Sequence, residues 1–568
     1  MPRTRLINNT EPEIHGTSNT LVVLLHGMVR NLSDWREALK EFLPNADLLI
    51  PRYASHVLSN VAPRRVADQL AQYIHEAVTN RSRRLDGGEY ERIILIGYSA
   101  GGLIIRKTYL IAMGYGDDDK LVGDTRPLPW AKKVERIILM AAINRGISDT
   151  RPETMNWLVY GLQRVVWVVI PRLGSGKFLS RLRQGTPFVA NLRVQWIRLT
   201  QAPDIQLPPT IQLLGDLDDV VAPQDNVDVV ADANFRYLKV RDTGHNSIRN
   251  FKEPDTGSHR KERFRYALMT PIEVLEGDVI PNANEVGQSK NYIVFVMHGI
   301  RDMGLWTIGV EQTVETVAQQ LGQSVEVITA GYGYFPMLRF LFLGARQKNV
   351  RWFMDKYTEA IARYPDAKVS FIGHSNGTYL LASALRRYHA CKVNRVAFAG
   401  SVVPKDYPWD ELVQHRRVQE IRNDIASADW VVGVFPGLFE LLRLSDIGTA
   451  GHNGFQDDAP KKKSIPAYFK GGHGAAIQPE NYTSLAHFIL TGEVIKPKPK
   501  EEEELLVAHQ EAWTVLLAKL CWAIWLVIAA IAVALGFLFS SLLSLVSVPP
   551  MVAWLLYAGF ILLLLYTL

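Results

Sequence analysis

One short stretch constrains the fold of this chain more than any other: a predicted strand that turns sharply into a predicted helix at a serine. The apolar run at 92–96 leads into the motif GYSAG at 97–101, and a helix-like segment follows from residue 103. A turn this tight requires glycine at Gly97 and Gly101, and it leaves Ser99 projecting at the apex. The stretch therefore predicts a parallel α/β sheet with Ser99 as a candidate nucleophile.

The same arrangement occurs a second time. The sequence LVVLLHG at 21–27 reappears as YIVFVMHG at 292–299, and GYSAG reappears as GHSNG at 373–377. The interval between the two landmarks is nearly the same in both places. We therefore predict two copies of one domain.

In each copy, short β-branched runs alternate with longer amphipathic segments such as 67–78, whose apolar positions recur at helical spacing. This alternation is typical of a mainly parallel sheet covered by helices. In the first copy the predicted strands are 21–25, 46–50, 92–96, 136–140, 211–214 and 237–240. The second copy adds 324–329, 395–399, 418–422 and 465–469 to the runs that begin at 292 and 369.

An almost wholly apolar tail follows the second copy. After the charged segment KPKPKEEEE at 496–504, one apolar run extends from 521 to 548 and another from 551 to 568, separated by two prolines. A helix needs about 20 apolar residues to cross a bilayer, so the tail predicts two spans. Tryptophans gather near the first span, lysines precede it, and the turn between the spans has no charge. By the positive-inside rule, we expect a multi-pass membrane protein whose folded domains face the cytoplasm.

Composition argues against several classes of function. The 568 residues carry a net charge of +6 without a long basic arm, so we expect no nucleic-acid partner. Only Cys391 and Cys521 occur, which argues against a disulfide framework and a cysteine metal site. No His-Glu-x-x-His motif or phosphate-binding glycine loop is present, so we expect neither metal nor cofactor. The N-terminus lacks the apolar segment of a secretory signal. The sequence contains no feature that predicts the oligomeric state.

A serine hydroxyl becomes a useful nucleophile only beside a histidine base that a carboxylate orients. In the first copy, His245 follows the predicted strand 237–240. Asp218 lies after the strand 211–214 and just before two valines, and the order serine, aspartate, histidine is the one expected for this type of sheet. We predict Ser99, Asp218 and His245 as the catalytic residues. The competing acids are Asp216 and Asp219.

Taken together, these motifs resemble those of α/β-hydrolases, and more narrowly the lipase-like serine esterases related to the GPI inositol deacylases. The resemblance rests on LHGM at 25–28, GYSAG at 97–101, GDLD at 215–218 and GH at 244–245, and it covers most of residues 20–270. The segment AAINRG at 141–146 is similar to the Thr-Pro-x-x-Gly segment of lipases, although the Thr-Pro is missing. The resemblance implies an oxyanion hole made by the backbone N–H groups of Met28 and Ala100. His26 is then expected to be structural rather than a second base.

The second copy carries the same signature less cleanly. Ser375 is its candidate nucleophile, and Ile300 and Asn376 occupy the positions that match the oxyanion hole. Asp429 is the preferred acid and His473 the preferred base, because His473 follows the predicted strand 465–469. The rivals are Asp424 and His452. A working second triad and an inactive copy kept for packing or regulation both remain open.

The first copy has a much longer interval between its serine and its acid than the second. The apolar run at 157–170 within this interval is too short and too interrupted for a comfortable span. It predicts either an interfacial segment or cap over the site, or a helical cap packed in an ordinary core.

We therefore expect two α/β-hydrolase domains, each a mainly parallel sheet flanked by helices, followed by C-terminal transmembrane helices. The expected function is a membrane-anchored serine hydrolase acting on an acyl-ester or lipid substrate, and the same chemistry also covers thioesters and amides. The alternative is a membrane-tethered binding or regulatory protein with one or both copies inactive. The predicted boundaries are 1–270 for the first domain with a cap at about 150–200, 271–290 for a linker, 291–492 for the second domain, 493–512 for a charged linker and 513–568 for the hairpin.

Overall fold

The computed structural model divides the chain into two compact units, which are described separately. Unit 1 comprises Met1–Val286 with Met354–Pro365, and unit 2 comprises Gly287–Phe353 with Asp366–Leu568. The structure describes all residues except 1–5, 15–18, 29, 83–87, 116–126, 149–156, 158–160, 162–170, 172–173, 203–204, 219–233, 279–288, 301–303, 330, 332–339, 341–342, 444–445, 457–464, 466, 498–503 and 568.

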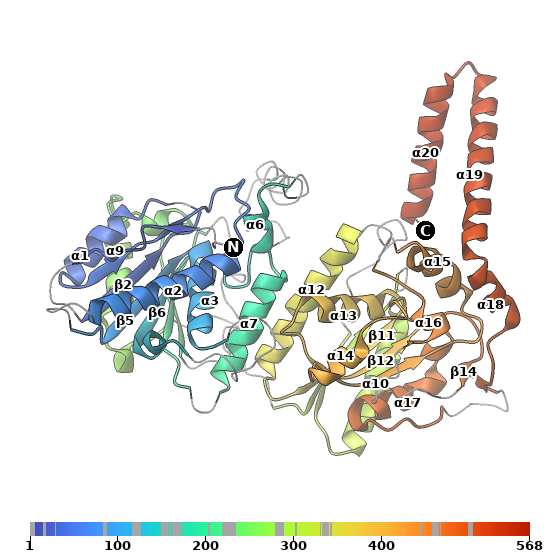
Figure 1. Cartoon of the computed structure of the whole chain (residues 1–568), viewed down its shortest axis with the longest axis horizontal. Coiled ribbons are helices and arrows are strands. Elements are labelled where there is room, and N and C mark those ends of the chain that lie inside the picture. The colour runs from blue at the N-terminus through green and yellow to red at the C-terminus, as the bar shows by residue number, and fades with distance from the viewer. Residues whose placement is uncertain are drawn as a thin grey trace. The chain divides into compact units, whose positions relative to one another are not determined.

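Unit 1 is built on a six-stranded parallel sheet with the order β3-β2-β5-β6-β7-β8 (Figure 1). Most residues of its strands are buried, because a parallel sheet covered on both faces consists of nearly continuous apolar runs. All six predicted strands of the first copy are present. Their bounds are β2 Thr20–Leu25, β3 Asp47–Leu49, β5 Arg92–Tyr98, β6 Val134–Met140, β7 Thr210–Gly215 and β8 Phe235–Val240.

Helices cover both faces of this sheet. One core contains α2 (Pro63–Ser82), α3 (Ala100–Ala112) and α7 (Pro187–Thr200), and the other contains α1 (Ser33–Phe42) and α9 (Gly257–Met269). A short antiparallel pair, β1 (Ile7–Asn8) with β4 (Arg52–Tyr53), lies outside the main sheet. The α/β class expected from the alternating pattern is therefore the observed one.

The predicted cap at 150–200 is described only in part. Most of 149–173, including nearly all of the apolar run at 157–170, lies outside the described residues. The described remainder forms α6 (Lys177–Arg181) and α7, and α7 packs on α3. In that contact Trp196 lies 6.1 Å from the ring of Tyr109 and beneath the guanidinium of Arg106. This part of the insertion consequently belongs to the core of unit 1.

Unit 2 contains a five-stranded parallel sheet with the order β10-β9-β11-β12-β13. Its strands are β9 Tyr292–Met297, β10 Val325–Ile328, β11 Lys368–His374, β12 Val393–Ala399 and β13 Val418–Asp424. Its helices are α10 Leu305–Gln320, α13 Asn376–Arg387, α14 Trp409–Gln414, α15 Trp430–Leu441, α16 Ala450–Asn453 and α17 Pro479–Thr491. The helix α12 (Leu343–Arg363) is divided between the units, because its residues from Met354 onward belong to unit 1. The strand order of unit 2 matches that of unit 1 strand for strand from β3 to β7.

The last predicted strand of the second copy, 465–469, is wrong in extent. Among its described residues, Tyr468–Phe469 forms a strand, β14, which pairs antiparallel with β15 (Leu506–Val507) inside the predicted charged linker. Pro466, which lies outside the described residues, breaks this run in the sequence, and proline cannot donate to a strand ladder. A single parallel bridge from Phe469 to Ala426 nevertheless sets β14 beside the extension of β13. This is the place that β8 occupies beside β7 in unit 1.

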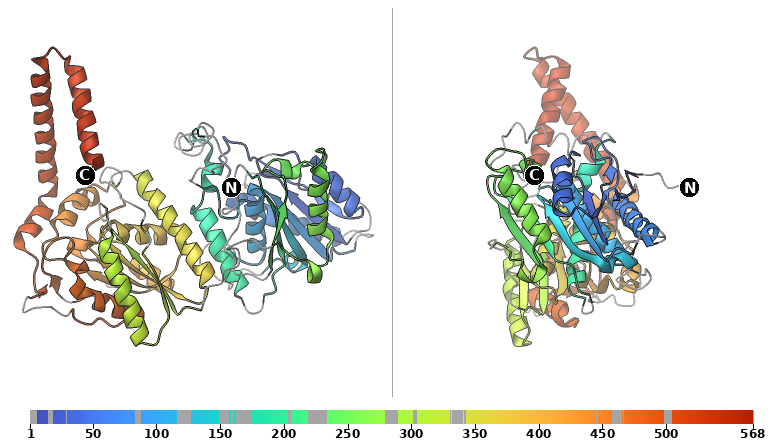
Figure 2. Two further views of the ribbon diagram at one scale, coloured as in Figure 1. Left: turned by 180° about the vertical axis from the view of Figure 1, so that it is seen from behind. Right: turned by 90° about the vertical axis from the view of Figure 1, so that its left-hand side faces the viewer.

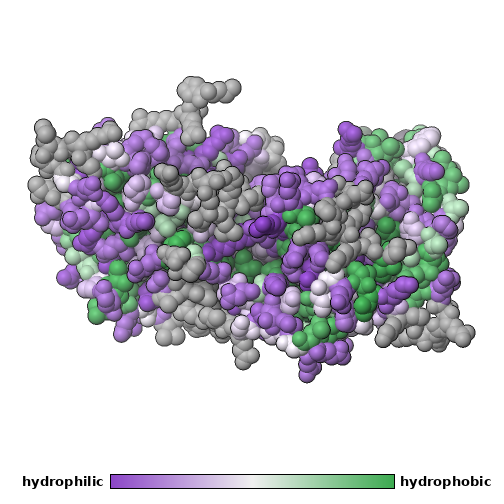
Figure 3. Space-filling view, turned by 60° about the horizontal axis from the view of Figure 1, so that its bottom comes forward, coloured by the Kyte–Doolittle hydropathy of each residue, from purple (hydrophilic) through white to green (hydrophobic). Residues whose placement is uncertain are grey.

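The apolar tail of unit 2 forms three helices, α18 (Ala512–Lys519), α19 (Cys521–Ser544) and α20 (Pro550–Thr567). By length and composition α19 can cross a membrane, with a mean hydropathy of 2.6 and only 6% of its apolar window buried, whereas the apolar part of α20 at Pro550–Leu564 is shorter. The two helices lie side by side (Figures 1 and 2), and the Tyr557 hydroxyl donates to the Ala532 carbonyl. On the face seen in Figure 3, hydrophilic residues predominate over unit 1 and hydrophobic ones gather toward the right-hand end, on unit 2.

Candidate active site

Ser99 lies at the sharp turn between β5 and α3, with φ 50° and ψ −122°. A non-glycine residue in this region is strained, and such strain is characteristic of functional turns. The flanking glycines permit the turn, because a Cβ on Gly101 would lie 2.6 Å from the carbonyl oxygen of His26. Ser375, between β11 and α13, has almost the same backbone angles, φ 52° and ψ −122°. Both copies thus project a serine from the same kind of turn.

In unit 1 the three predicted catalytic residues form one hydrogen-bonded chain. His245 Nε2 lies 2.9 Å from Ser99 Oγ, and His245 Nδ1 lies 3.0 Å from Asp218 Oδ2. All three side chains are buried. Asp218 can therefore hold the proton on Nδ1, which leaves Nε2 free to accept the serine proton.

Two loops meet to bring Asp218 and His245 together. Asp218 follows β7 and His245 follows β8, and the loops are joined because Leu217 N–H donates to the Thr243 carbonyl. The Thr243 N–H in turn donates to Asp216 Oδ1, 3.1 Å away. Asp216, a competing acid, therefore fixes the loops instead of facing the histidine. The other competitor, Asp219, lies outside the described residues.

Two further residues support His245, and neither belongs to a recognisable pattern in the sequence. The Tyr98 hydroxyl donates to the His245 carbonyl at 3.1 Å. Arg260, buried on α9, donates to Thr243 Oγ1 and to the Asp242 carbonyl. Long-range contacts between a helix and a loop leave no local pattern in the sequence, so only the fold reveals them.

The predicted oxyanion residues lie beside Ser99. Ala100 is the first residue of α3, so its N–H has no acceptor within the helix. Met28 follows Gly27, where a Cβ would approach Ser99 Oγ to 3.3 Å and Ser99 Cβ to 2.8 Å. The absence of a side chain at Gly27 thus lets the β2 loop approach the serine closely, as a pair of backbone donors around one oxygen requires.

His26 has the contacts of a structural residue. Its Nδ1 lies 2.7 Å from the Gly27 carbonyl oxygen, and its Nε2 accepts from the Tyr53 N–H at 3.2 Å. The Tyr53 ring stacks on the imidazole at 4.5 Å, and its hydroxyl donates to the His26 carbonyl. These contacts fit one neutral tautomer and fix the strand end that carries Met28.

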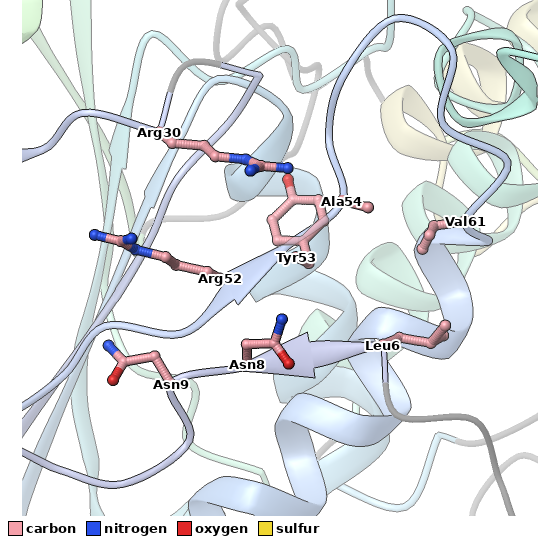
Figure 4. Close-up of a pocket in the computed structure, with 8 residues that line it drawn as sticks. All are labelled: Leu6, Asn8, Asn9, Arg30, Arg52, Tyr53, Ala54 and Val61. Atoms are coloured by element: carbon pink, nitrogen blue, oxygen red, sulfur yellow. The ribbon is translucent and has the colours of Figure 1, made fainter.

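Tyr53 also lines a pocket of about 740 Å³ (Figure 4). Figure 4 shows Arg30 reaching toward the Tyr53 hydroxyl, while Arg52 extends the opposite way beside Asn8 and Asn9. None of the three residues of the Ser99 chain lines this pocket. Its arginines act on His26 instead, because both positive charges oppose protonation of the imidazole.

The pKa of His26 makes the stability of unit 1 depend on pH. Burial, aided by Arg30 and Arg52 and opposed by the bond to Gly27, lowers this pKa from 6.5 to about 4. Between these values the unfolded chain binds a proton that the folded chain does not, so stability falls as the pH falls. From pH 7 to pH 5 the loss is about 2 kcal/mol.

We expect a His26→Gln variant to lose this pH dependence, whatever its stability at pH 7. Hydrogen exchange of the β2 peptide at pH 7 and pH 5, corrected for intrinsic rates, measures the difference. Equal slopes in the variant and the wild type would contradict the assignment.

In unit 2 the acid and the base are in contact. His473 Nδ1 lies 2.9 Å from Asp429 Oδ2. Among the described residues, however, no hydrogen bond joins His473 to Ser375, although a bond of this kind exists in unit 1. The hydrogen-bonded chain of unit 2 therefore lacks the contact between histidine and serine that unit 1 has.

The rival candidates of the second copy have other partners. Asp424 forms two 2.8 Å bonds to the guanidinium of Arg422 within the core. His452 Nδ1 lies 3.1 Å from the Asp429 carbonyl oxygen rather than from its carboxylate, and burial lowers the pKa of His452. Asp429 and His473 are consequently the pair that the fold brings together.

The predicted oxyanion residues of the second copy lie as those of the first do. Asn376 is the first residue of α13, and Ile300 follows Gly299, where a Cβ would lie 2.8 Å from Ser375 Cβ. The His298 ring lies 2.9 Å from the Gly299 carbonyl oxygen, as His26 does from that of Gly27. Within the described part of the chain, no group of three or more His, Cys, Asp or Glu residues could hold a metal ion.

The N-terminal part of the chain matches one known protein family. Residues 16–120 match the family described as "Putative serine esterase (DUF676)". This segment contains β2, Met28 and the Ser99 turn, but neither Asp218 nor His245. No curated protein matches the chain.

Solved structures similar to the chain include three hydrolases. A monoacylglycerol lipase from Paleococcus ferrophilus is 12% identical, with 45% of this chain and 93% of that one covered and a TM-score of 0.26. The esterase Est2 from Thermogutta terrifontis is 17% identical, with 47% and 88% covered and a TM-score of 0.29. Phospholipase PlaB from Legionella pneumophila is 19% identical, with 37% and 40% covered and a TM-score of 0.23. These identities are too low to transfer an activity to this chain.

Proposed function

We propose that this protein is a membrane-anchored serine hydrolase that cleaves acyl esters, with Ser99 as nucleophile, His245 as base and Asp218 as the carboxylate that orients the base. The observation that carries the proposal is the hydrogen-bonded chain from Ser99 Oγ through both ring nitrogens of His245 to Asp218. The match of the surrounding segment to a serine-esterase family supports the same class of reaction.

The contacts support a two-step acyl transfer. Ser99 Oγ attacks the ester carbonyl while His245 Nε2 takes its proton and then delivers it to the leaving alcohol. Water, activated by the same nitrogen, releases the acyl group. The backbone N–H groups of Met28 and Ala100 bind the oxyanion in both steps, and each such donor typically contributes about 3 kcal/mol to lowering the barrier.

For unit 2 we propose Ser375, His473 and Asp429 in the same roles, with Ile300 and Asn376 at the oxyanion hole. The identical serine turn and the contact between His473 and Asp429 favour activity. The missing bond to Ser375 favours the alternative, in which this copy binds a lipid or partner without turnover.

A membrane substrate fits the rest of the chain. The exposed apolar helix α19 supports an anchor, and α20 completes a hairpin with it that we propose enters the bilayer as a second span. The lysines before α19 favour cytoplasmic domains. Anchoring raises the effective concentration of a lipid ester around the sites. We therefore propose a lipid acyl ester as the substrate class.

A fluorophosphonate probe tests the nucleophiles, because it modifies a serine only where a base activates it. We expect labelled peptides containing Ser99 in the full-length wild type, and loss of that label in Ser99→Ala but not in Ser375→Ala. Mass spectrometry of the modified peptides distinguishes the two serines in one sample. Equal labelling of wild type and the double alanine variant would overturn the proposed function.

A further inference from the structure

We propose that α15 of unit 2 lies in the membrane interface and that this contact sets the second candidate site through Asp429. The inference rests on the proposed function and deepens it, since it names a membrane surface as the element that controls Ser375. Three observations support it: the contacts of Asp429, the contacts of the tail helices with α15, and the exposed apolar residues of α15.

Asp429 belongs to the helix and to the site at once. Its Oδ1 accepts from the Val432 N–H at 3.1 Å and so caps the first turn of α15. Its Oδ2 lies 2.9 Å from His473 Nδ1. The side chain is fully buried, so both contacts are protected from water. A shift of α15 along or about its axis therefore moves the carboxylate that orients His473.

The C-terminal tail also contacts α15 and the residues just before it. The Glu511 N–H, just before α18, donates to the Ser427 carbonyl at 2.9 Å. Trp525 of α19 donates through Nε1 to the Val434 carbonyl at 3.2 Å, and its ring meets Phe435 edge to face at 5.6 Å. The first tail helices thus contact α15 directly and are more than a flexible tether to the domain.

Gly433 permits this close packing, and Gly437 lies at ordinary contact distance from the tail. A Cβ on Gly433 would lie 3.1 Å from Ala518 Cβ, and one on Gly437 would lie 3.7 Å from the sulfur of Cys521. Gly433 and Gly437 are four residues apart and so share one face of α15. This face of α15, together with Phe435, packs against the tail helices.

The exposed residues of α15 are those of an interfacial helix. Trp430, Leu441 and Leu442 at its ends are 41%, 60% and 52% exposed, and the exposed Arg443 follows. The tail repeats this combination with exposed Lys519 and Trp522 where α19 begins, and α15 lies at that end of the hairpin (Figure 1). Tryptophan and basic residues mark the interface of a bilayer. With 12 residues, α15 is too short to span and suited to lie in the headgroup region.

The missing contact to Ser375 gives this arrangement a consequence for catalysis. A displacement of about 1 Å at a catalytic group commonly costs about 100-fold in rate. Seating α15 in the bilayer fixes the position of Asp429, and with it the distance from His473 to Ser375. Ser99 lies in unit 1 and α15 in unit 2, so labelling of Ser99 serves as an internal reference.

The first test locates α15. A nitroxide is attached at Leu442→Cys and, as a matched control, at Leu321→Cys, which is 40% exposed at the end of α10 in the same unit. Both native cysteines are buried, which favours labelling of the introduced one. In nanodiscs of phosphatidylcholine and phosphatidylglycerol, we expect residue 442 to collide with lipid-soluble oxygen and residue 321 with a water-soluble nickel complex. Contact of residue 442 with the nickel complex alone would overturn the interfacial position.

The second test measures the coupling as the ratio of fluorophosphonate labelling rates at Ser375 and Ser99 in the same nanodisc sample. We expect Leu441→Gln with Leu442→Gln to lower this ratio at least tenfold, Trp525→Phe to lower it as well, and Leu321→Gln to leave it unchanged. An unchanged ratio in the first two variants, or labelling of Ser99 without any labelling of Ser375, would overturn the coupling and leave the first site intact. Absence of label at both serines would instead overturn the proposed function.

Discussion

Ester hydrolysis by a Ser99→Ala variant, measured in a Ser375→Ala background, is expected to fall by roughly 10⁶-fold in kcat. The expectation follows from the continuous contact of Ser99, His245 and Asp218, because His245 can accept the serine proton only while Asp218 holds its ring in place, so the three groups act as a unit. His245→Ala is expected to cost about as much as Ser99→Ala, and the double variant no more than either. Asp218→Asn favours the wrong tautomer of the His245 ring and is expected to lower kcat by about 10⁴-fold.

The matched control for Asp218→Asn is Asp216→Asn. Asp216 lies two residues away, and its Oδ1 accepts from the Thr243 N–H, a bond that asparagine can keep. We expect this variant to retain activity within a few-fold. Steady-state kinetics on a soluble short-chain ester measures both changes. Multiplicative losses from Ser99→Ala and His245→Ala, or an equal loss from Asp216→Asn, would show that these residues do not form one relay.

The parts of this architecture that could be predicted are those with local signals. The serine turns are specified by glycines within two residues of Ser99 and Ser375, and the buried parallel strands appear as continuous apolar runs. Asp218 and His245 could be predicted because each lies in the loop after a strand, and the carboxyl ends of parallel strands meet at one edge of the sheet.

The features that escaped prediction depend on distant partners. Arg260 supports the His245 loop from a helix whose sequence shows only mixed charge. The final strand of the second copy is cut to Tyr468–Phe469, and its antiparallel partner lies in a segment whose lysines and glutamates indicated a linker. The sequence favoured Asp429 over Asp424 as the partner of His473, but the contact that engages Asp424, with the Arg422 guanidinium, appears only in the fold.

Substitution by asparagine is therefore expected to have different effects at Asp424 and at Asp429, the two acids of the second copy. Asp424 and Arg422 are fully buried and joined by two bonds, and Arg422 also reaches Ser484 and Asn481 on α17. Asp424→Asn leaves the arginine buried without a countercharge, which typically costs 3–5 kcal/mol. We expect protection of the β13 and α17 amides against hydrogen exchange to fall by roughly 10²- to 10⁴-fold.

Asp429→Asn removes the charge that orients His473 but keeps an oxygen that can cap α15, because asparagine caps helices as well as aspartate does. We expect its exchange protection to stay within a few-fold of wild type while labelling of Ser375 is lost. Replacing both members of the ion pair, as Arg422→Met with Asp424→Leu, is expected to recover much of the protection, since no buried charge is then left unpaired. Protection unchanged in Asp424→Asn, or lost equally in Asp429→Asn, would contradict this division, in which one acid holds β13 to α17 and the other orients the base.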